Sequence, residues 1–296
     1  MKKAIRVHIL PLHRYDINYS YCLYHSIKDD KNTLDLVTLD NKLSEISTKF
    51  DIIQINLAGG EISLLSDFYF EMLYNLCKIY CKKIQVFTSF FKVNKSLINN
   101  CEVINVLYNF LNPNKTVMSN IQAAVASDKI INLKTFDVYC NDDIIQMINH
   151  VNNMKVKSFE IIPYIKSTED YTFCENKIKE FLKNSNKMKF AFQNKLQLDK
   201  ILQIDNYNVK NIFILPNGKY GLQTFENNSF SFKEYDEIEE FSKNIEELEI
   251  FRDKICKNCT SKLQCMANYF LNLSYVGKSC CGFKDLVEDY KKGRQQ

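Results

Sequence analysis

The residues best suited to chemistry lie near the C-terminus, where several cysteines are closely spaced. Cys256, Cys259 and Cys265 form a C-x2-C-x5-C pattern, and Cys280-Cys281 follows after a gap. Three neighbouring thiolates and a distant fourth can form a tetrahedral S4 pocket, which suits Zn²⁺ or an iron–sulfur cluster. The spacing therefore predicts a four-cysteine metal site, and it leaves open whether Cys280 or Cys281 is the fourth ligand.

The other cysteines in apolar surroundings are predicted to be buried thiols. Of the 11 cysteines, five lie in or beside apolar segments: Cys77, Cys81, Cys101, Cys140 and Cys174. Arg6 and His8 interrupt the short N-terminal apolar stretch, which predicts a strand rather than a signal peptide, and no apolar run reaches membrane-spanning length. These features predict a cytoplasmic protein without membrane contact, whose cysteines are thiols or metal ligands rather than disulfides.

The balance of charges argues against nucleic acid as a partner. The 39 basic and 35 acidic residues leave a net charge of +4, and no run of Lys and Arg is interleaved with aromatic residues. The four histidines show no spacing that pairs them with a Ser or Cys nucleophile, and there is no glycine-rich phosphate-binding loop. His150 is expected to be solvated, on the polar side of its amphipathic helix. The sequence therefore predicts no nucleic-acid partner and indicates no catalytic residue.

Short apolar strands alternate with helices from residue 1 to about residue 165. The predicted strands are Ala4–Leu10, Ile52–Leu57, Ile84–Thr88, Val103–Tyr108, Thr135–Cys140 and Phe159–Pro163. Helical periodicity predicts helices over Asp67–Cys81, capped by Ser66, and over Asp142–Met154, capped by Asn141. This alternation predicts an α/β fold with a parallel sheet, open or curled into a partial barrel, with ligands at the carboxyl ends of the strands.

A second, smaller domain is predicted over residues 205–296, after a first domain over residues 1–204. Strands over Asn211–Leu215 and Tyr220–Phe225 flank a tight turn in which Gly218 takes the left-handed position. An acidic segment, Glu234 to Glu249, then leads into the cysteine cluster, and its helical face carries Ile238, Phe241, Ile245 and Leu248. We expect the two domains to pack as one body.

Several segments together resemble radical SAM enzymes that carry a C-terminal SPASM extension. Asn18–His25 resembles the family's cluster-binding C-x3-C-x2-C segment, and Leu57–Ile62 resembles its Gly-Gly-Glu-Pro segment. Residues 136–164 resemble the fifth strand, the helix and the sixth strand, whereas 212–219 and 238–265 resemble the SPASM hairpin, helix and cysteines. The resemblance covers most of the chain. It implies a degenerate, partial (β/α)6 barrel followed by a small SPASM-like metal-binding module.

The segments that would bind the radical cofactor depart from the family's pattern. Only the middle cluster thiolate is kept, as Cys22, and one thiolate, one amide and one imidazole do not hold a [4Fe–4S] cluster. Ile62 replaces the proline of the motif that contacts the amino group of SAM in the family. We interpret six residues as a vestigial site that binds neither cluster nor SAM: Asn18, Cys22, His25, Gly59, Gly60 and Glu61. The other interpretation of the Gly-Gly-Glu segment is a sharp strand-to-helix connection with an exposed carboxylate.

The SPASM-like region resembles a SPASM domain in which only one of the two metal sites has all its ligands. In the family two sites are interleaved here, and Gln223 and Tyr269 occupy ligand positions of the first. The second site is complete, with the C-x2-C-x5-C cysteines and one downstream cysteine. The resemblance implies a [4Fe–4S] cluster in that site, with Zn²⁺ as the alternative. Either metal would stabilise a small region, because its binding free energy becomes folding free energy.

The resemblance implies a pseudoenzyme of peptide maturation. The chain resembles the SPASM protein of grasp-with-SPASM systems, which accompanies an ATP-grasp ligase. The implied role is to bind a ribosomally made precursor peptide and to present it to a modifying enzyme or activate that enzyme, with an exposed strand edge as one binding mode. Because the barrel begins near residue 4, we expect peptide recognition without an N-terminal leader-binding domain. Two alternatives stay open: an active maturation enzyme that uses its one auxiliary cluster, and a zinc-stapled structural partner of an intact radical SAM homologue.

Overall fold

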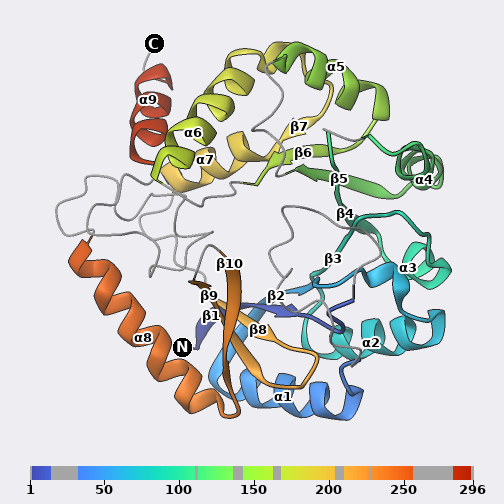
Figure 1. The fold of residues 1–296 in the computed structure, drawn as a ribbon, viewed down its shortest axis with the longest axis vertical. Helices are drawn as coiled ribbons and strands as arrows, with labels where there is room; N and C mark the ends of the chain where they lie inside the picture. Colours follow the sequence, from blue (N-terminus) through green and yellow to red (C-terminus); the bar gives the residue numbers. More distant parts are fainter. Residues whose placement is uncertain are drawn as a thin grey trace. The chain divides into compact units, whose positions relative to one another are not determined.

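The described part of the chain falls into two compact units that interleave along the sequence (Figure 1). The computed structural model describes residues 2–14, 33–110, 113–135, 143–162, 168–203, 210–226, 229–255 and 283–294. The first unit draws on Met1–Leu107, Lys115–Ile131 and Val209–Glu246. The second draws on Tyr108–Asn114, Asn132–Asn208 and Glu247–Gln296. Each unit is thus built from segments that lie far apart in the sequence.

A mixed sheet forms the centre of the first unit, with the strand order β10-β9-β8-β1-β2-β3-β4. The strands are β1 (Lys3–Ile9), β2 (Phe50–Leu57), β3 (Ile84–Thr88), β4 (Val103–Leu107), β8 (Lys210–Ile214), β9 (Tyr220–Glu226) and β10 (Ser229–Tyr235). The strands from β8 through β4 run parallel, whereas β9 and β10 are antiparallel to their neighbours. Ile9 lies opposite both Leu57 and Ile214, so the carboxyl ends of three strands meet at one edge.

One face of this sheet is apolar and packs against helices. The helices of the first unit are α1 (Leu36–Lys49), α2 (Asp67–Tyr80), α3 (Lys95–Asn100), α4 (Lys115–Ala126) and the first half of α8 (Ile238–Ile255), with a 3₁₀ turn η2 (Ile62–Leu64). Alternate strand residues such as Val7 and Ile55 are fully buried, as are Leu43 of α1 and Leu73 of α2. Apolar side chains recur every two residues in the strands and about every 3.6 residues in the helices, so each element has one apolar face. The contact between these apolar faces forms the core.

Helices α1, α2 and α3, which follow β1, β2 and β3 in the chain, each have a side-chain N-cap. Asp35 accepts a hydrogen bond from Thr38 N–H, Ser66 from Tyr69 N–H and Asn94 from Leu97 N–H. Each cap satisfies one of the main-chain N–H groups that a helix start leaves without a partner. The starts of these three helices are therefore fixed by local hydrogen bonds.

The second unit contains three parallel strands and its own aromatic core. Its strands are β5 (Ile130–Thr135), β6 (Ser158–Ile161) and β7 (Ala191–Phe192), and its helices are α5 (Ile144–Met154), α6 (Thr168–Lys183), α7 (Gln193–Gln203) and α9 (Lys284–Arg294), with a 3₁₀ turn η4 (Ser185–Lys187). Phe159 of β6 packs against Phe181 and Phe192, with ring centroids 5.4 and 6.2 Å away. Helix α9 contacts α6 and α7, and its Leu286 N–H donates to Glu175 at 3.0 Å.

His150 in α5 belongs to this aromatic core. Its Nε2 lies 2.8 Å from the Tyr108 hydroxyl, and its ring contacts that of Phe110 with centroids 5.7 Å apart. Burial lowers the pKa of His150 and raises the pKa of Tyr108 to about 12. The interpretation of His150 as a solvated residue on the polar side of its helix is therefore wrong.

Most of the predicted elements are confirmed, and two details are corrected. Strand β3 has the predicted bounds, and Ser66 caps α2 as predicted. The strand predicted over Thr135–Cys140 is instead β5, which ends at Thr135, and residues 136–140 lie outside the described part. Asp143 rather than Asn141 caps α5, accepting from Gln146 N–H. The helical face predicted within Glu234–Glu249 lies in α8, which begins at Ile238 and extends past that segment to Ile255.

The hairpin that was assigned to the smaller domain lies in the first unit. Strands β8 and β9 and the turn between them, with Gly218 at φ = +79° as predicted, extend the sheet next to β1. The domain boundary between residues 204 and 205 stays a prediction. Among the described residues, none of the helices has the length and apolar character that crossing a bilayer requires.

Candidate functional site

The Gly-Gly-Glu turn directly follows β2, at the carboxyl ends of the parallel strands. Gly59 and Gly60 have φ angles of +87° and +57°, a region that residues with a side chain rarely adopt. A Cβ atom on Gly59 would lie 2.3 Å from Leu10 Cγ, and one on Gly60 would lie 2.6 Å from the main-chain oxygen of Leu12. Both glycines are therefore required by the backbone conformation and by the close approach of the segment after β1.

Glu61 ends this turn with a buried carboxylate, of which only 3% is exposed. Its main-chain N–H donates to the Arg14 carbonyl at 2.8 Å. One carboxylate oxygen accepts from Ser63 N–H at 3.0 Å and from the Thr88 hydroxyl, and the other accepts from Ser89 N–H at 2.7 Å. The expectation of an exposed carboxylate is wrong, because Glu61 joins the end of β2 to the end of β3.

A left-handed residue follows at the end of β3. Phe90 has φ = +60° and is 1% exposed. Its N–H donates to Thr88 Oγ1 at 2.9 Å, and its carbonyl accepts from Asn120 Nδ2 on α4 at 2.9 Å. This conformation is rare for a bulky residue and persists only where the surroundings determine it. One connected network thus holds the carboxyl ends of β1, β2 and β3.

This network limits what Glu61 can contribute to binding SAM. The resemblance implies that the motif contacts the amino group of SAM. In this chain the Glu61 carboxylate already accepts three hydrogen bonds from the protein. An ionised carboxylate offers about four lone-pair sites, so little accepting capacity is left for an ammonium group. Glu61 does not fit a direct ligand contact, whereas it fits the structural role of joining two strand ends.

The sheet face opposite the helices carries polar side chains. His8 lies opposite Asn56 and Phe213 in the parallel register, and Asn56 lies opposite Gln85, so these side chains share one face. The same alternation places further polar residues there. This polar face consists of Arg6, His8, Gln54, Asn56, Gln85, Asn105 and Asn211.

Amide and imidazole groups form a hydrogen-bonded row on the polar face. Gln54 Nε2 donates to Asn56 Oδ1 at 2.7 Å, and Asn56 Nδ2 lies 3.4 Å from His8 Nδ1. On the other side His8 Nε2 lies 3.2 Å from Asn211 Oδ1, and the ring stacks on Phe213 with centroids 4.6 Å apart. Because Asn211 Oδ1 is an acceptor, the neutral ring carries its proton on Nε2 and accepts at Nδ1.

His8 is neutral at physiological pH. Its pKa is lowered to about 4, mainly by burial and then by the positive charge of Arg6, while the hydrogen bond to Asn211 acts in the opposite direction. Apart from Arg6, the polar face consists of neutral groups that both donate and accept. Such a surface suits the amide groups of a peptide better than it suits a charged ligand.

Sequence reasoning missed the polar face, although a signal was present. Arg6 and His8 were noted only as interruptions of an apolar stretch. They are separated by one residue, as are Gln54 and Asn56 in the next strand. A polar period of two within apolar strands predicts a sheet with one packed face and one hydrogen-bonding face.

The predicted metal ligands lie outside the described residues. This applies to Cys256, Cys259, Cys265, Cys280 and Cys281, and equally to Asn18, Cys22 and His25. In the ranges that the structure describes, no three His, Cys, Asp or Glu side chains are grouped in a way that could hold a metal ion. The four-cysteine site and the loss of the radical cluster therefore stay predictions.

The cysteines predicted to be buried thiols are confirmed where the structure describes them. Cys77, Cys81, Cys101 and Cys174 are buried thiols, and Cys140 lies outside the described part. Burial raises the pKa of Cys77 and raises that of Cys101 to about 12. Both thiols stay protonated and unreactive at neutral pH.

Comparisons with known proteins bear on the fold. No protein-family model and no curated protein matches the sequence. Among solved structures, native anSMEcpe with bound AdoMet is similar at a TM-score of 0.65 and 14% identity, covering 98% of this chain and 96% of that chain. The same protein with AdoMet and the Cp18Cys peptide also gives 0.65, at 12% identity, covering 100% of this chain and 96% of that one.

A second similar protein is SuiB of Streptococcus suis, in its structure bound to the precursor peptide SuiA. The TM-score is 0.57 at 13% identity, and the match covers 74% of this chain and 59% of SuiB. This chain therefore corresponds to about six-tenths of the length of SuiB. At such low identities the likeness shows the fold alone. The predicted fold class is confirmed: the chain has an α/β fold with a parallel-strand sheet that matches those of the radical SAM enzymes anSMEcpe and SuiB.

Proposed function

We propose that this chain is a non-radical pseudoenzyme that binds a ribosomally made precursor peptide in the cytoplasm. It presents the peptide to a modifying enzyme or activates that enzyme, which is an ATP-grasp ligase or an intact radical SAM homologue. The observation that carries the proposal is the polar face, a row of neutral hydrogen-bonding groups on a sheet whose other face is packed core. The similar proteins SuiB and anSMEcpe have been crystallised with peptides.

The chemistry of the polar face favours a peptide as the ligand. The side chains of Gln54, Asn56 and Asn211 offer the same carbonyl and N–H groups as a peptide backbone, and Phe213 adds an aromatic surface beside them. A peptide would reach this row through its partly exposed members, His8, Gln85 and Asn211, because Gln54 and Asn56 are buried and bond to each other. Strand β10, the last in its sheet order, offers a second mode through strand addition.

Two features support the absence of radical chemistry. Asn18 and His25 stand where the family has cluster thiolates, and hard or neutral ligands replace thiolates poorly at an iron–sulfur cluster. The Glu61 carboxylate is occupied by hydrogen bonds within the protein. The pseudoenzyme interpretation rests on these two features together.

The remaining metal site is proposed to stabilise the C-terminal region. Cys256, Cys259, Cys265 and one of Cys280 and Cys281 would hold a [4Fe–4S] cluster, with Zn²⁺ as the alternative. Either metal would supply folding free energy to the C-terminal region. Metal analysis of anaerobically purified protein separates the two, because about four irons indicate a cluster and about one zinc indicates a zinc site.

Peptide binding is tested with synthetic peptides encoded by short open reading frames beside the gene of this chain. Fluorescence anisotropy measures their affinity for the wild type and for Asn211→Leu, which removes an amide from the polar face. We expect the affinity to fall about 5- to 10-fold, the equivalent of one hydrogen bond. The matched control is Gln146→Leu, which makes a similar change at an exposed site on α5. Equal affinities for the wild type and Asn211→Leu would contradict the proposed binding face.

The two alternative functions predict different results. Mass spectrometry of the bound peptide after incubation with SAM and a reductant reports on catalysis, and any mass change would favour an active maturation enzyme. Tight co-purification with an intact radical SAM homologue, together with no affinity for any of the peptides, would favour a zinc-stapled structural partner. Peptide binding without a mass change supports the pseudoenzyme.

A further inference from the structure

Helix α2 carries apolar side chains on two opposite faces. Its inner face, which includes Leu73 and Cys77, is buried in the core of the first unit. Its outer face carries Phe68, Met72 and Ile79, whose exposed fractions are 76%, 47% and 75%. A surface helix ordinarily has one apolar stripe and a polar remainder. A second, exposed stripe therefore indicates a contact that a single copy of this chain does not make.

The exposed stripe has the spacing of a seam between two packed helices. It consists of Phe68, Met72, Asn75 and Ile79, which we call the α2 seam. Steps of four, three and four residues place these side chains in one row along the helix. Two helices pack side by side through rows of this kind, and a single polar Asn within such a row fixes the register of the pair.

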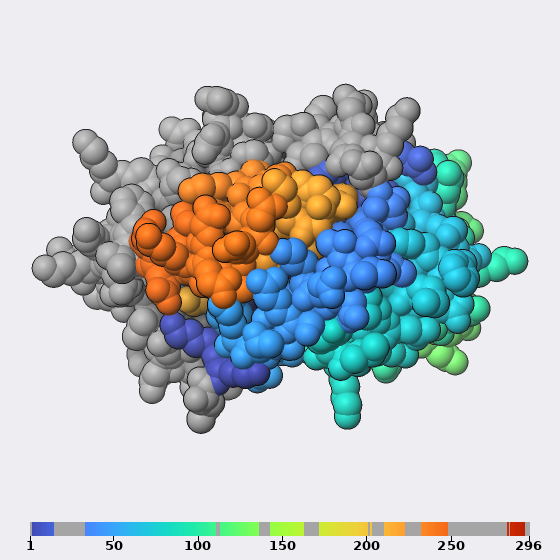
Figure 2. Space-filling view, turned by 90° about the horizontal axis from the view of Figure 1, so that it is seen from below, coloured from blue at the N-terminus to red at the C-terminus, as the bar shows by residue number. Residues whose placement is uncertain are grey.

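Helix α1 extends the apolar surface along one edge of the α2 seam. The Tyr69 hydroxyl donates to the Leu34 carbonyl, just before α1. The Tyr80 hydroxyl donates to the Asp40 carboxylate within α1. Val37 is 69% exposed and precedes Asp40 by three residues, so it lies on the side of α1 that borders α2. Figure 2 shows the blue α1 and the lighter blue α2 as adjoining parts of one face.

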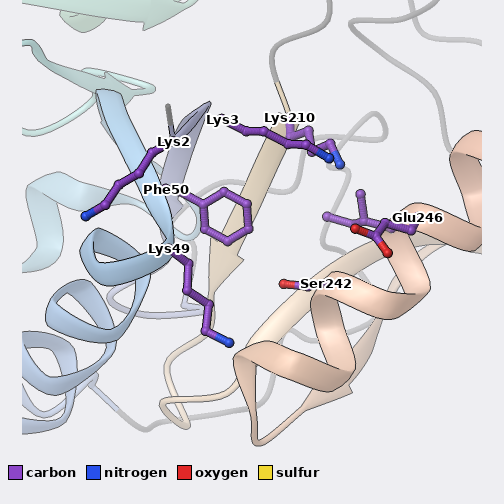
Figure 3. A pocket seen from close by; sticks show the side chains of 8 residues that line it. Lys2, Lys3, Lys49, Phe50, Lys210, Ser242 and Glu246 are labelled. Carbon is purple, nitrogen blue, oxygen red and sulfur yellow. The ribbon is translucent and has the colours of Figure 1, made fainter.

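The other edge of α1 is occupied by α8. Lys49 forms an ion pair with Glu239, and Figure 3 shows the Lys49 side chain reaching from α1 toward α8. Lys42 donates to the main-chain oxygen of Asp236, just before α8. Contacts within the chain thus cover the α8 side of α1, whereas Val37 and the α2 seam stay exposed on its other side.

Two opposite charges flank the α2 seam on the edge away from α1. Glu71 and Lys78 are both exposed, and Lys78 Nζ lies 4.8 Å from the centroid of the Tyr74 ring. Lys78 follows Glu71 by two helical turns, about 10.5 Å along the axis, so the two cannot pair with each other. When two identical helices pack antiparallel, these edges lie side by side, and Glu71 of each copy meets Lys78 of the other.

We infer that α2 packs against α2 of a second copy of this chain, antiparallel and about a two-fold axis. Phe68 of each copy then contacts Ile79 of the other, and the two Asn75 amides lie beside the axis, where they can bond to each other. With Val37, the α2 seam exposes on the order of 500 Å² of apolar surface per copy. The pair would therefore bury about 1,000 Å² in total, the lower limit for a specific interface, and we expect a dimer of micromolar affinity.

Sedimentation velocity of the full chain, between about 1 and 100 μM, measures this association. Phe68→Ser/Ile79→Ser should weaken the dimer by at least about 100-fold, because each copy loses two buried apolar side chains. Glu71→Lys and Lys78→Glu should each weaken it by about 5- to 100-fold, because both ion pairs become repulsive. The matched control is Lys200→Glu, the same change at an exposed lysine in the last turn of α7, which should leave the dimer unchanged.

Mixing the two charge variants tests the antiparallel direction. Equal amounts of Glu71→Lys and Lys78→Glu should form a heterodimer, because both ion pairs then join opposite charges. Misfolding cannot restore association in this way, so the mixture stays decisive even if one variant folds poorly. A wild type that is monomeric at about 100 μM, or a Phe68→Ser/Ile79→Ser variant that still dimerises, would overturn the inference. A mixture that stays monomeric would overturn the antiparallel pairing.

This inference does not depend on the proposed peptide site. The polar face lies on the side of the sheet away from α1 and α2, so each copy in the dimer keeps that face accessible. Phe68→Ser/Ile79→Ser should leave the affinity for the precursor peptides unchanged, and Asn211→Leu should leave the dimer unchanged. The two proposals can therefore fail independently.

Discussion

Replacement of Glu61 by glutamine tests whether the Gly-Gly-Glu turn is a structural element. The carboxylate accepts from Ser63 N–H and the Thr88 hydroxyl at one oxygen and from Ser89 N–H at the other. Glutamine keeps the shape and loses one acceptor. Whichever way its amide is turned, the NH₂ group faces a main-chain N–H, of Ser63 or of Ser89. One buried N–H therefore loses its partner and meets another donor.

The expected cost follows from these bonds. Losing one charge-assisted hydrogen bond costs about 1.5–3 kcal/mol, and a buried N–H without an acceptor costs about 1–3 kcal/mol. The bonds that remain become neutral and are weaker. Removing a buried charge returns part of this loss, because the carboxylate no longer has to be desolvated. We therefore expect Glu61→Gln to lower the free energy of unfolding by about 2–4 kcal/mol.

Urea denaturation followed by circular dichroism measures this change. With an m value of about 3 kcal/mol per M, the midpoint should fall by about 1 M. The matched control is Glu71→Gln, the same change at an exposed position on α2, which should move the midpoint very little. A double-mutant cycle with Thr88→Val should give a coupling energy of about 0.5–3 kcal/mol, because the two side chains share one hydrogen bond.

One result would refute the reasoning. If Glu61→Gln unfolded at the same urea concentration as the wild type, the hydrogen bonds of this carboxylate would not hold the two strand ends together. A loss of SAM affinity in the same variant, at unchanged stability, would instead favour a ligand-binding Glu61. The stability measurement and a SAM titration together therefore decide between a structural and a binding role.

Three further predictions concern the turn, the polar face and the metal site. Gly60→Ala should destabilise the protein by about 2–4 kcal/mol in thermal melts, because alanine is strained at a left-handed φ and its Cβ would contact the Leu12 carbonyl. The control is Gly293→Ala on α9, where the added Cβ meets no other atom, and it should stabilise the protein by up to about 1 kcal/mol. The pKa of His8 is lowered to about 4, so between pH 6.5 and 4 the unfolded chain binds a proton that the folded protein does not. The contribution of His8 to stability should be fully present above pH 6.5 and be lost by at most about 3 kcal/mol toward pH 4. His8→Gln should remove that contribution, and leave the one from His150, in urea midpoints taken at pH 7 and 4.5. Cys256→Ala/Cys259→Ala should abolish bound iron or zinc in elemental analysis and lower the melting temperature, and unchanged metal content would contradict the four-cysteine site.

The features that the sequence predicted well are local ones. The bounds of β3, the Ser66 cap and the left-handed Gly218 each depend on residues within a few positions of one another. An N-cap needs a hydrogen bond three residues along, and a hairpin turn needs one glycine at a fixed place. Such elements can be identified without knowledge of the remaining chain.

The features that the sequence could not predict depend on residues that are distant along the chain. Glu61 was expected to be exposed, because its partners Thr88 and Ser89 become neighbours only when β2 and β3 pair. His150 was expected to be solvated, because Tyr108 lies 42 positions away. Burial of a polar group is decided by tertiary contacts, and one sequence carries no direct signal for them.

The Gly-Gly-Glu segment can be explained without a bound cofactor. Each residue of the turn has a structural role within the protein. Gly59 and Gly60 allow positive φ angles and close approach to the segment after β1, and Glu61 accepts hydrogen bonds from the start of η2 and the end of β3. Selection for folding alone would preserve all three, because each substitution costs about 2 kcal/mol or more. Ile62, by contrast, is fully buried in η2, where its side chain contributes to the core. A Gly-Gly-Glu segment followed by an isoleucine is thus explained by the fold of this chain alone.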